Sequence, residues 1–147
     1  MMHPMVQKMA DMIPDPLPGD DKTNINNYLY DLELSDDEAG VGIIKTYAVE
    51  NLGKMALRYD AELLMICGAL PHIKKALYNS NDHVVAATAR ACSYIAQSGG
   101  AQALLDEGFS LILMSVATDS QKNFYVRDAC ARAFGWLHVM REIESKH

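Results

Sequence analysis

Small and apolar residues recur at helical spacing over residues 81–97, NDHVVAATARACSYIAQ. One apolar stripe runs from Val84 to Ile95 in steps of three or four residues, and a second stripe lies beside it. Asn81 is a favourable cap for the start of this helix, and Ser-Gly-Gly at 98–100 is expected to end it. Because alanine is frequent in this stretch, we expect neighbouring helices to pack closely on two sides of it.

The same pattern returns 42 residues later, since residues 126–137 repeat the residue types of 84–95. A weaker copy, TYAVENLG at 46–53, lies about 43 positions earlier. A period of this length is typical of stacked helical repeats, in which no single unit buries its apolar faces alone. The sequence therefore predicts an all-α fold, a right-handed α–α superhelix of about three repeats. Its long helices are expected near residues 36–58, 82–97 and 124–143.

The segments between the long helices also follow a common order. A short helix, a glycine break, a medium helix, a turn and a long helix succeed one another twice, from residue 61 to 97 and from 101 to 144. This layout, together with CGALP at 67–71 and AVENLG at 48–53, resembles the armadillo repeat family. The resemblance implies stacked three-helix repeats over about residues 24–144, with the two-helix HEAT repeats as the near alternative. Residues 109–111, FSL, depart from the family's A-L-P pattern.

The chain is expected to divide into a leader, residues 1–23, and a repeat domain, residues 24–147. The leader is rich in methionine, proline and aspartate, and its three closely spaced prolines predict a linker rather than a helix. Its methionines could make an adaptable contact with a partner or cover the end of the repeat domain. An amphipathic helix is predicted over residues 24–34, and SDDE at 35–38 has the spacing of a capping box that opens the next helix.

Composition narrows the class of protein. The net charge is −6, and most of the carboxylate excess lies in residues 1–38, so the remainder is nearly neutral and gives no support to nucleic-acid binding. No apolar run is long enough for a transmembrane helix, and the N-terminus lacks the features of a secretory signal. Three cysteines, two of them in apolar helix stripes, are typical of buried reduced thiols. We expect a cytoplasmic protein, with attachment to cytoskeletal or axonemal structures as a variant.

No arrangement of residues predicts catalysis. The five histidines are scattered, none at metal-ligand spacing from a cysteine or carboxylate, and there is no phosphate-binding glycine loop. The cysteines lack an evident nearby base. We therefore expect a non-enzymatic protein with no catalytic residue, metal or cofactor.

The armadillo resemblance implies a protein-binding groove. In that family the third helix of each repeat lines a concave groove that holds extended peptides, and a signature asparagine bonds the peptide backbone. Asn51 matches this asparagine, while Tyr94 and Trp136 take its place in the next two repeats. The predicted groove residues are these three and those one turn earlier: Tyr47, Asn51, Arg90, Tyr94, Arg132 and Trp136. The alternatives are that the rings belong to the core, that Asn51 bonds a neighbouring helix end, and that both arginines are solvated.

Two functions follow as hypotheses. The first is an adaptor or scaffold whose groove binds an extended, acidic segment of a partner protein through aromatic and arginine side chains. The second is a structural subunit of a larger cytoskeletal, axonemal or other assembly, held by its ends and outer faces. The final helix lacks a broad polar face, so we expect a second copy, a partner or the leader to cover it. Reversing the charges of Arg90 and Arg132 is expected to abolish partner capture and to leave the fold intact.

Overall fold

The computed structural model describes residues 21–146, which form helices and connecting turns without a β-strand in that range. The all-α prediction is confirmed for this part of the chain. The methionine-rich contact segment and the proline-rich linker, which are predicted for the leader, fall in residues 1–20 and lie outside the described residues. The helices are α2 (Asp21–Leu32), α3 (Val41–Arg58), α4 (Ala61–Ile66), α5 (Ala69–Ala76), α6 (Asp82–Ile95), α7 (Ala101–Asp106), α8 (Phe109–Ala117) and α9 (Phe124–Ser145). A π-helical turn, Ala96–Gly100, joins α6 to α7.

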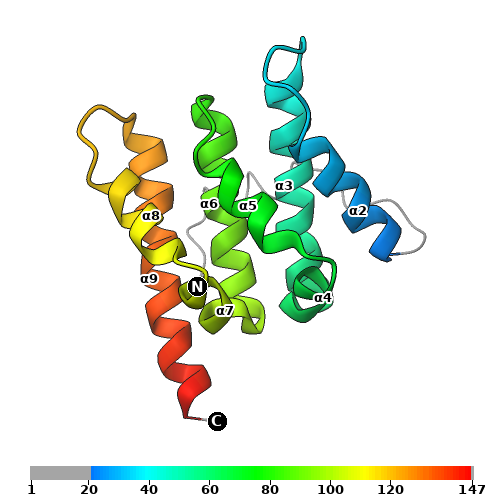
Figure 1. The fold of residues 1–147 in the computed structure, drawn as a ribbon. Coiled ribbons are helices and arrows are strands. Elements are labelled where there is room, and N and C mark those ends of the chain that lie inside the picture. Colours follow the sequence, from blue (N-terminus) through cyan, green and yellow to red (C-terminus); the bar gives the residue numbers. More distant parts are fainter. Residues whose placement is uncertain (1–20, 147) are drawn as a thin grey trace.

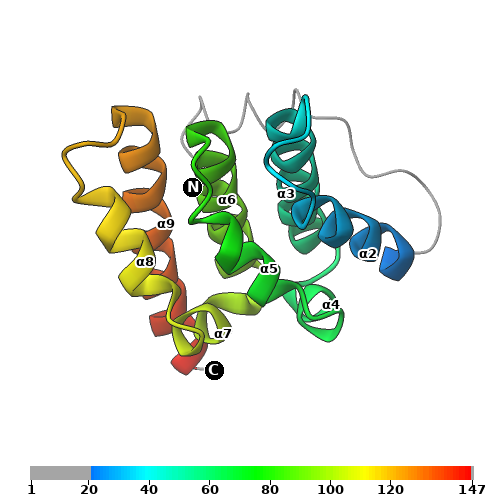
Figure 2. The same ribbon diagram turned by 45° about the horizontal axis from the view of Figure 1, so that its top comes forward.

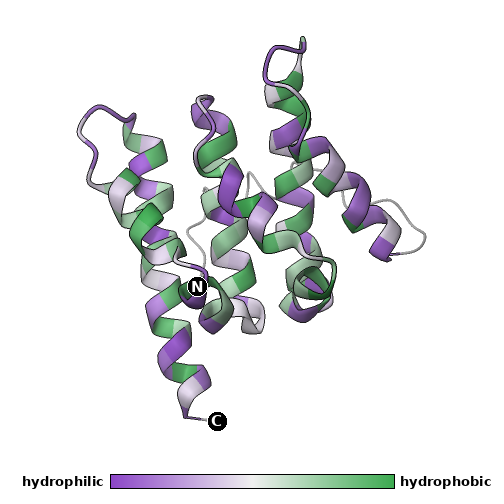
Figure 3. Cartoon of the chain, in the orientation of Figure 1, coloured by the Kyte–Doolittle hydropathy of each residue, from purple (hydrophilic) through white to green (hydrophobic). Residues whose placement is uncertain are grey.

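The three long helices α3, α6 and α9 stand side by side in one row (Figure 1). We call them the long-helix row. Helices α2, α5 and α8 lie on one side of this row, and the short helices α4 and α7 lie near its lower end (Figures 1 and 2). The hydrophilic turns before α3, α6 and α9 all lie at the same upper end (Figure 3). Equivalent segments of the sequence repeat therefore occupy equivalent places in space.

Side-chain hydrogen bonds join segments that lie about one repeat apart in the sequence. The carboxylate of Asp82 accepts a hydrogen bond of 2.6 Å from the amide of Asn123, 41 residues later. Asp36 accepts a bond of 3.1 Å from Asn79, 43 residues later. Near the lower end, the Glu144 carboxylate accepts bonds from two backbone N–H groups at the start of α7. These bonds satisfy polar groups at helix starts and turns that would otherwise rely on water.

Helix α3 begins at Val41, five residues later than the capping-box spacing predicts. Gly40 precedes it with a φ of 74°, a left-handed conformation that glycine adopts without strain. Ser35, the cap residue of the predicted box, accepts a 3.3 Å bond at Oγ from the N–H of Asp37, but residues 36–40 form turns rather than helix. In this turn the carboxylate of Asp36 accepts a 2.8 Å bond from Nζ of Lys45 as well as the bond from Asn79. Helix α2 begins at Asp21, inside the segment predicted as leader, and buries the predicted apolar face.

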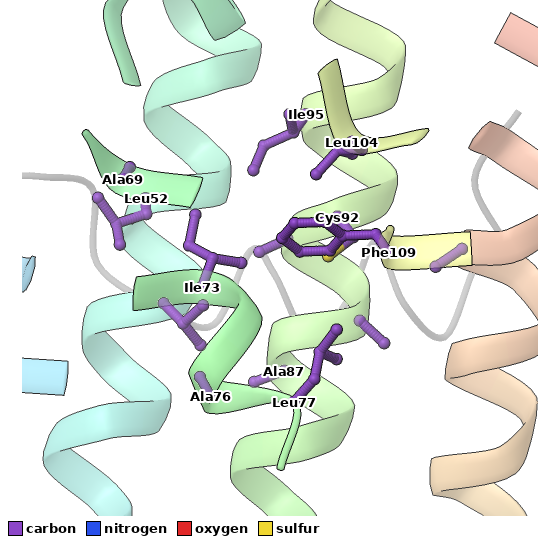
Figure 4. Close-up of a cluster of buried hydrophobic side chains, with 14 of the residues drawn as sticks. Leu52, Ala69, Ile73, Ala76, Leu77, Ala87, Cys92, Ile95, Leu104 and Phe109 are labelled. Atoms are coloured by element: carbon purple, nitrogen blue, oxygen red, sulfur yellow. The ribbon is translucent and has the colours of Figure 1, made fainter. Parts of the chain in front are cut away.

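The core lies between the long-helix row and helices α5 and α8. Leu52, Ile73, Cys92, Ile95 and Phe109 meet there and are buried (Figure 4). Eleven of the fourteen residues of α6 are buried, which fits its position between α3 and α9. The long helices approach closely because their contacts use small residues, as the alanine-rich sequence of α6 predicts.

Candidate functional site

The predicted groove residues of α6 and α9 point away from α5 and α8. Arg90 and Tyr94 each lie two residues from Cys92, and such residues are about 200° apart around a helix. Cys92 faces the core beside Phe109 of α8 (Figure 4). In α9, the imidazole Nε2 of His138 is 3.0 Å from Oγ of Ser110 in α8, which fixes the side of α9 that faces α8. We call the opposite side of the long-helix row the groove face.

The six predicted groove residues differ in accessibility. Asn51 and Tyr94 are fully buried, and the Arg90 side chain is only 11% exposed. Tyr47 and Trp136 are half-buried and pack partly against the core, whereas the Arg132 side chain is 42% exposed. Of these six, the accessible residues on the groove face are therefore Arg132 and Trp136 of α9. The Tyr47 ring lies toward α2, where it makes an edge contact with Tyr28 at a centroid distance of 6.5 Å.

Arg90 forms a buried ion pair with Glu50 of α3. Its Nε donates a 2.8 Å bond to Oε1 of Glu50, and its Nη2 donates to the same oxygen. Glu50 is 1% exposed, and burial raises the pKa of its carboxyl group despite the bonded guanidinium. The expectation that a charge reversal at Arg90 leaves the fold intact is therefore revised. A second carboxylate at this place would face a buried one without compensation.

Arg132, the equivalent arginine of α9, is solvated on one side. Its Nε donates a 2.8 Å bond to Asp128, one turn earlier on the same helix. The two arginines share a repeat position but not an environment, because α9 is followed by no further long helix in the described residues. Only Arg132 is accessible enough to meet a carboxylate of a partner.

Several buried polar atoms of α3 and of the turn after α6 lack a hydrogen-bond partner among the described residues. They include Oε2 of Glu50, Oδ1 of Asn51 and Nε2 of Gln97. The side-chain amide of Asn51 also donates a 3.1 Å bond to the carbonyl of Tyr47, one turn earlier. Unpaired buried acceptors and donors are uncommon in folded proteins. Because these atoms expose less than 1 Å² each, a partner cannot contact them without movement of the side chains around them.

Sequence reasoning missed Glu50 as a functional residue. It immediately precedes the signature asparagine, and nothing in its local pattern distinguishes it from a solvated glutamate. The ion pair that Glu50 forms depends on Arg90, which lies 40 residues later in the sequence. A ring stack between His83 and Tyr125, with centroids 5.6 Å apart, was also outside the sequence prediction and joins α6 to α9 near their starts.

The outer side of the molecule carries a separate cleft of about 330 Å³. It lies between the turn after α5 and helix α8, with Leu77 and Ile112 among its lining residues. Two large side chains at this cleft, Tyr78 and Leu111, are 70% and 80% exposed. This cleft is an alternative contact surface on the opposite side of the long-helix row.

The thiols of Cys92 and Cys130 are buried and unoxidised. Burial raises the pKa of both, to about 12 for Cys130, so neither is a nucleophile at neutral pH. Within residues 21–146, no three His, Cys, Asp or Glu side chains gather closely enough to hold a metal ion. No helix in the same range combines the length and apolar character needed to cross a bilayer.

Comparison of the chain with models of known protein families, with curated proteins and with solved structures gave no match.

Proposed function

We propose that this chain is a non-enzymatic adaptor of armadillo type, in which a right-handed α–α superhelix binds an extended partner segment along its groove face. The observation that carries the proposal is the placement of equivalent residues in successive layers. Arg90 and Tyr94 in α6 recur as Arg132 and Trp136 in α9, and on helical geometry both pairs point away from α5 and α8. A row of this kind suits a ligand that repeats along its length, as an extended peptide does.

The accessible residues suggest the chemistry of the partner. Tyr47 and Trp136 offer half-buried rings for apolar side chains, and Arg132 offers guanidinium N–H groups beyond those bonded to Asp128. Arg90 acts differently, since Glu50 already neutralises it. We therefore assign the recognition of an acidic residue to Arg132, and assign Asn51 and Tyr94 to the buried floor of the site. The reduced thiols favour a reducing compartment such as the cytoplasm.

The test is an array of synthetic extended peptides that vary in acidic and aromatic content, probed with labelled full-length chain. Arg132→Glu should abolish binding to the selected acidic peptides, and Trp136→Ala should weaken it. Arg141→Glu is the matched control, because it makes the same charge change on the same helix at a side chain that is 47% exposed. Equal binding by Arg132→Glu and Arg141→Glu, with both variants folded, would remove Arg132 from the site.

A second function, that of a structural subunit held by outer faces in a larger assembly, is favoured by the 330 Å³ cleft with exposed Leu111 and Tyr78. Under this function Leu111→Glu should prevent incorporation of the chain into its native assembly. Arg132→Glu should then have no effect on incorporation, which separates the two functions.

A further inference from the structure

Helix α6 is buried on every side. From residue 84 to residue 96 each residue except Arg90 is buried, and the Arg90 side chain is only 11% exposed. This stretch is more than three turns long, so it includes all directions around the helix axis. Helices α3 and α9 flank α6 in the long-helix row, and α5 and α8 lie on its core side (Figures 1 and 2). Within residues 21–146 no helix lies over its fourth side, the groove face.

Helix α3 is closed on the groove face as well. Its residues 48–53 are buried without a break, over more than one full turn. Leu52 faces the core (Figure 4), so Glu50 and Lys54, two residues away on either side, point about 200° away from that core. Glu50 is nevertheless only 1% exposed, although a glutamate on an open helix face would extend into water. The groove face at α3 and α6 therefore has a cover.

The cover belongs to the chain itself, because these buried fractions are those of a single copy without a partner. Apart from residues 21–146, the chain holds only residues 1–20 and His147. Asp21 begins α2, the outermost helix at the α3 end of the row (Figure 1). Neighbouring packed helices lie about 10 Å apart, whereas 20 extended residues span up to about 66 Å. Residues 1–20 are therefore long enough to cross α3 and α6.

The composition of residues 1–20 complements this part of the groove face. Three aspartates and one lysine give the segment a net charge of −2, with histidine neutral. On α3, Lys54 lies one turn after Glu50, and Arg58 lies one turn after Lys54. Burial raises the pKa of the Glu50 carboxyl, and the charges of Arg90 and Lys54 oppose this rise, which places Lys54 near Glu50. Five methionines in the segment offer adaptable apolar contacts for Tyr94.

We propose that residues 1–20 lie across the groove face at α3 and α6, with their aspartates beside Lys54 and Arg58 and their methionines against Tyr94. The segment then acts as an internal competitor for the groove. A partner segment reaches only the α9 end, at Arg132 and Trp136, until it displaces residues 1–20. The displacement rests on the proposed peptide-binding function, whereas the packing of residues 1–20 on their own chain does not.

The packing is tested by photo-crosslinking in the full-length chain, with Met9 replaced by the photoreactive residue benzoylphenylalanine. After irradiation, mass spectrometry should find the attachment in residues 43–58 or 86–97, within one chain. Mixing with an isotope-labelled copy separates attachment within a chain from attachment between chains. The same probe at Tyr30, which is 71% exposed on α2, is the control and should not attach to the groove face. Attachment only elsewhere, only between chains or nowhere would overturn the proposal.

Charge exchange tests the ionic part of the contact. Lys54→Glu with Arg58→Glu should lower the yield of attachment from the Met9 probe about fivefold, and so should Asp11→Lys with Asp15→Lys. All four substitutions together should restore the yield, because the charges are then exchanged. A yield that stays at the wild-type level in both double variants would overturn the assigned pairing.

The matched control is Arg141→Glu with Lys146→Glu, which makes the same charge change at two exposed residues near the end of the chain. It should attach like wild type. Far-UV circular dichroism establishes that each variant is folded.

Displacement is tested by the affinity for an acidic peptide selected on the array. Asp11→Lys with Asp15→Lys weakens the internal competitor, so the peptide should bind about fivefold more tightly than to wild type. Glu62→Lys with Glu107→Lys makes the same charge change at two exposed carboxylates and should bind like wild type. Equal affinity in both double variants would overturn the competition. An array without any bound peptide would instead remove the proposed function, while the crosslinking still decides the packing of residues 1–20.

Discussion

Gly53 offers a sharp test of the packing between the long helices. It lies inside α3, where alanine would ordinarily stabilise a helix by about 1 kcal/mol. A Cβ at this position would lie 2.7 Å from Cδ2 of Tyr94 and 3.0 Å from the backbone Cα of Ala91. Both neighbours are fully buried in α6, and a backbone atom cannot rotate away. Gly53→Ala should therefore force α3 and α6 apart.

The size of the effect follows from two opposing contributions. Overpacking of a dense core typically destabilises by about 1–3 kcal/mol, and contacts this short belong in the upper part of that range. After subtraction of the gain in helix propensity, Gly53→Ala should lower the free energy of unfolding by about 1–2 kcal/mol. For a chain of this size that corresponds to a fall in Tm of about 2–8 °C.

Gly135→Ala is the matched control, since it makes the same substitution inside α9 with nothing within 4 Å of the new methyl group. It should raise the free energy of unfolding by about 0.5–1 kcal/mol. Both variants and wild type would be unfolded in urea at the same dilute concentration and followed by far-UV circular dichroism. A Gly53→Ala variant as stable as Gly135→Ala would refute the close approach of α3 and α6.

Three further predictions concern ionic groups and thiols. Arg90→Met should lower the free energy of unfolding by about 3–5 kcal/mol, because it leaves Glu50 buried without its partner. The double variant Glu50→Met/Arg90→Met should be close to wild type in stability, because both charges are removed. Urea unfolding of the single and double variants measures both effects. In the native protein Cys67, which is partly exposed, should react with a thiol reagent at mildly alkaline pH, while the two buried thiols should react only after unfolding. Hydrogen bonds from Lys75 and His72 lower the pKa of Glu33 below 4.5, so its contribution to stability is present above pH 4.5 and lost as pH falls through the lowered value. Acid unfolding of Glu33→Gln should therefore depend less on pH in that window than acid unfolding of wild type.

The repeat and the main helices could be predicted from the sequence because their signals are local and periodic. The boundaries of α6 follow from its apolar stripes, the Asn81 cap and the glycines after it. The predicted start of α3 was wrong because the segment SDDE forms a turn, and the left-handed backbone of Gly40 separates this turn from the helix. A capping box is a local pattern, and the bond that holds Asp36 of this turn to Asn79, 43 residues away, does not appear in it.

The candidate site shows the same division. The repeat spacing predicts that Arg90 and Arg132 are equivalent, and on helical geometry both lie opposite the core side of their helices. Their accessibility could not be predicted, because it depends on the layer that follows each one. Arg90 lies beside the buried Glu50 of the preceding helix, whereas Arg132 lies on the last helix of the row and pairs with its own neighbour Asp128. The repeat position of each arginine can be read from the sequence, but its burial depends on which helices lie beside it in the folded chain.

Hydroxyl-radical footprinting of the chain with a peptide selected on the array tests the central claim most directly, because it reports the solvent access of individual side chains. If an extended segment binds along the groove face, modification of Tyr47 and Trp136 should fall when the peptide is added. Modification of Tyr78, which is 70% exposed at the outer cleft, should not change. Protection of Tyr78 with unchanged modification of Tyr47 and Trp136 would contradict the account and place binding on the opposite side of the long-helix row.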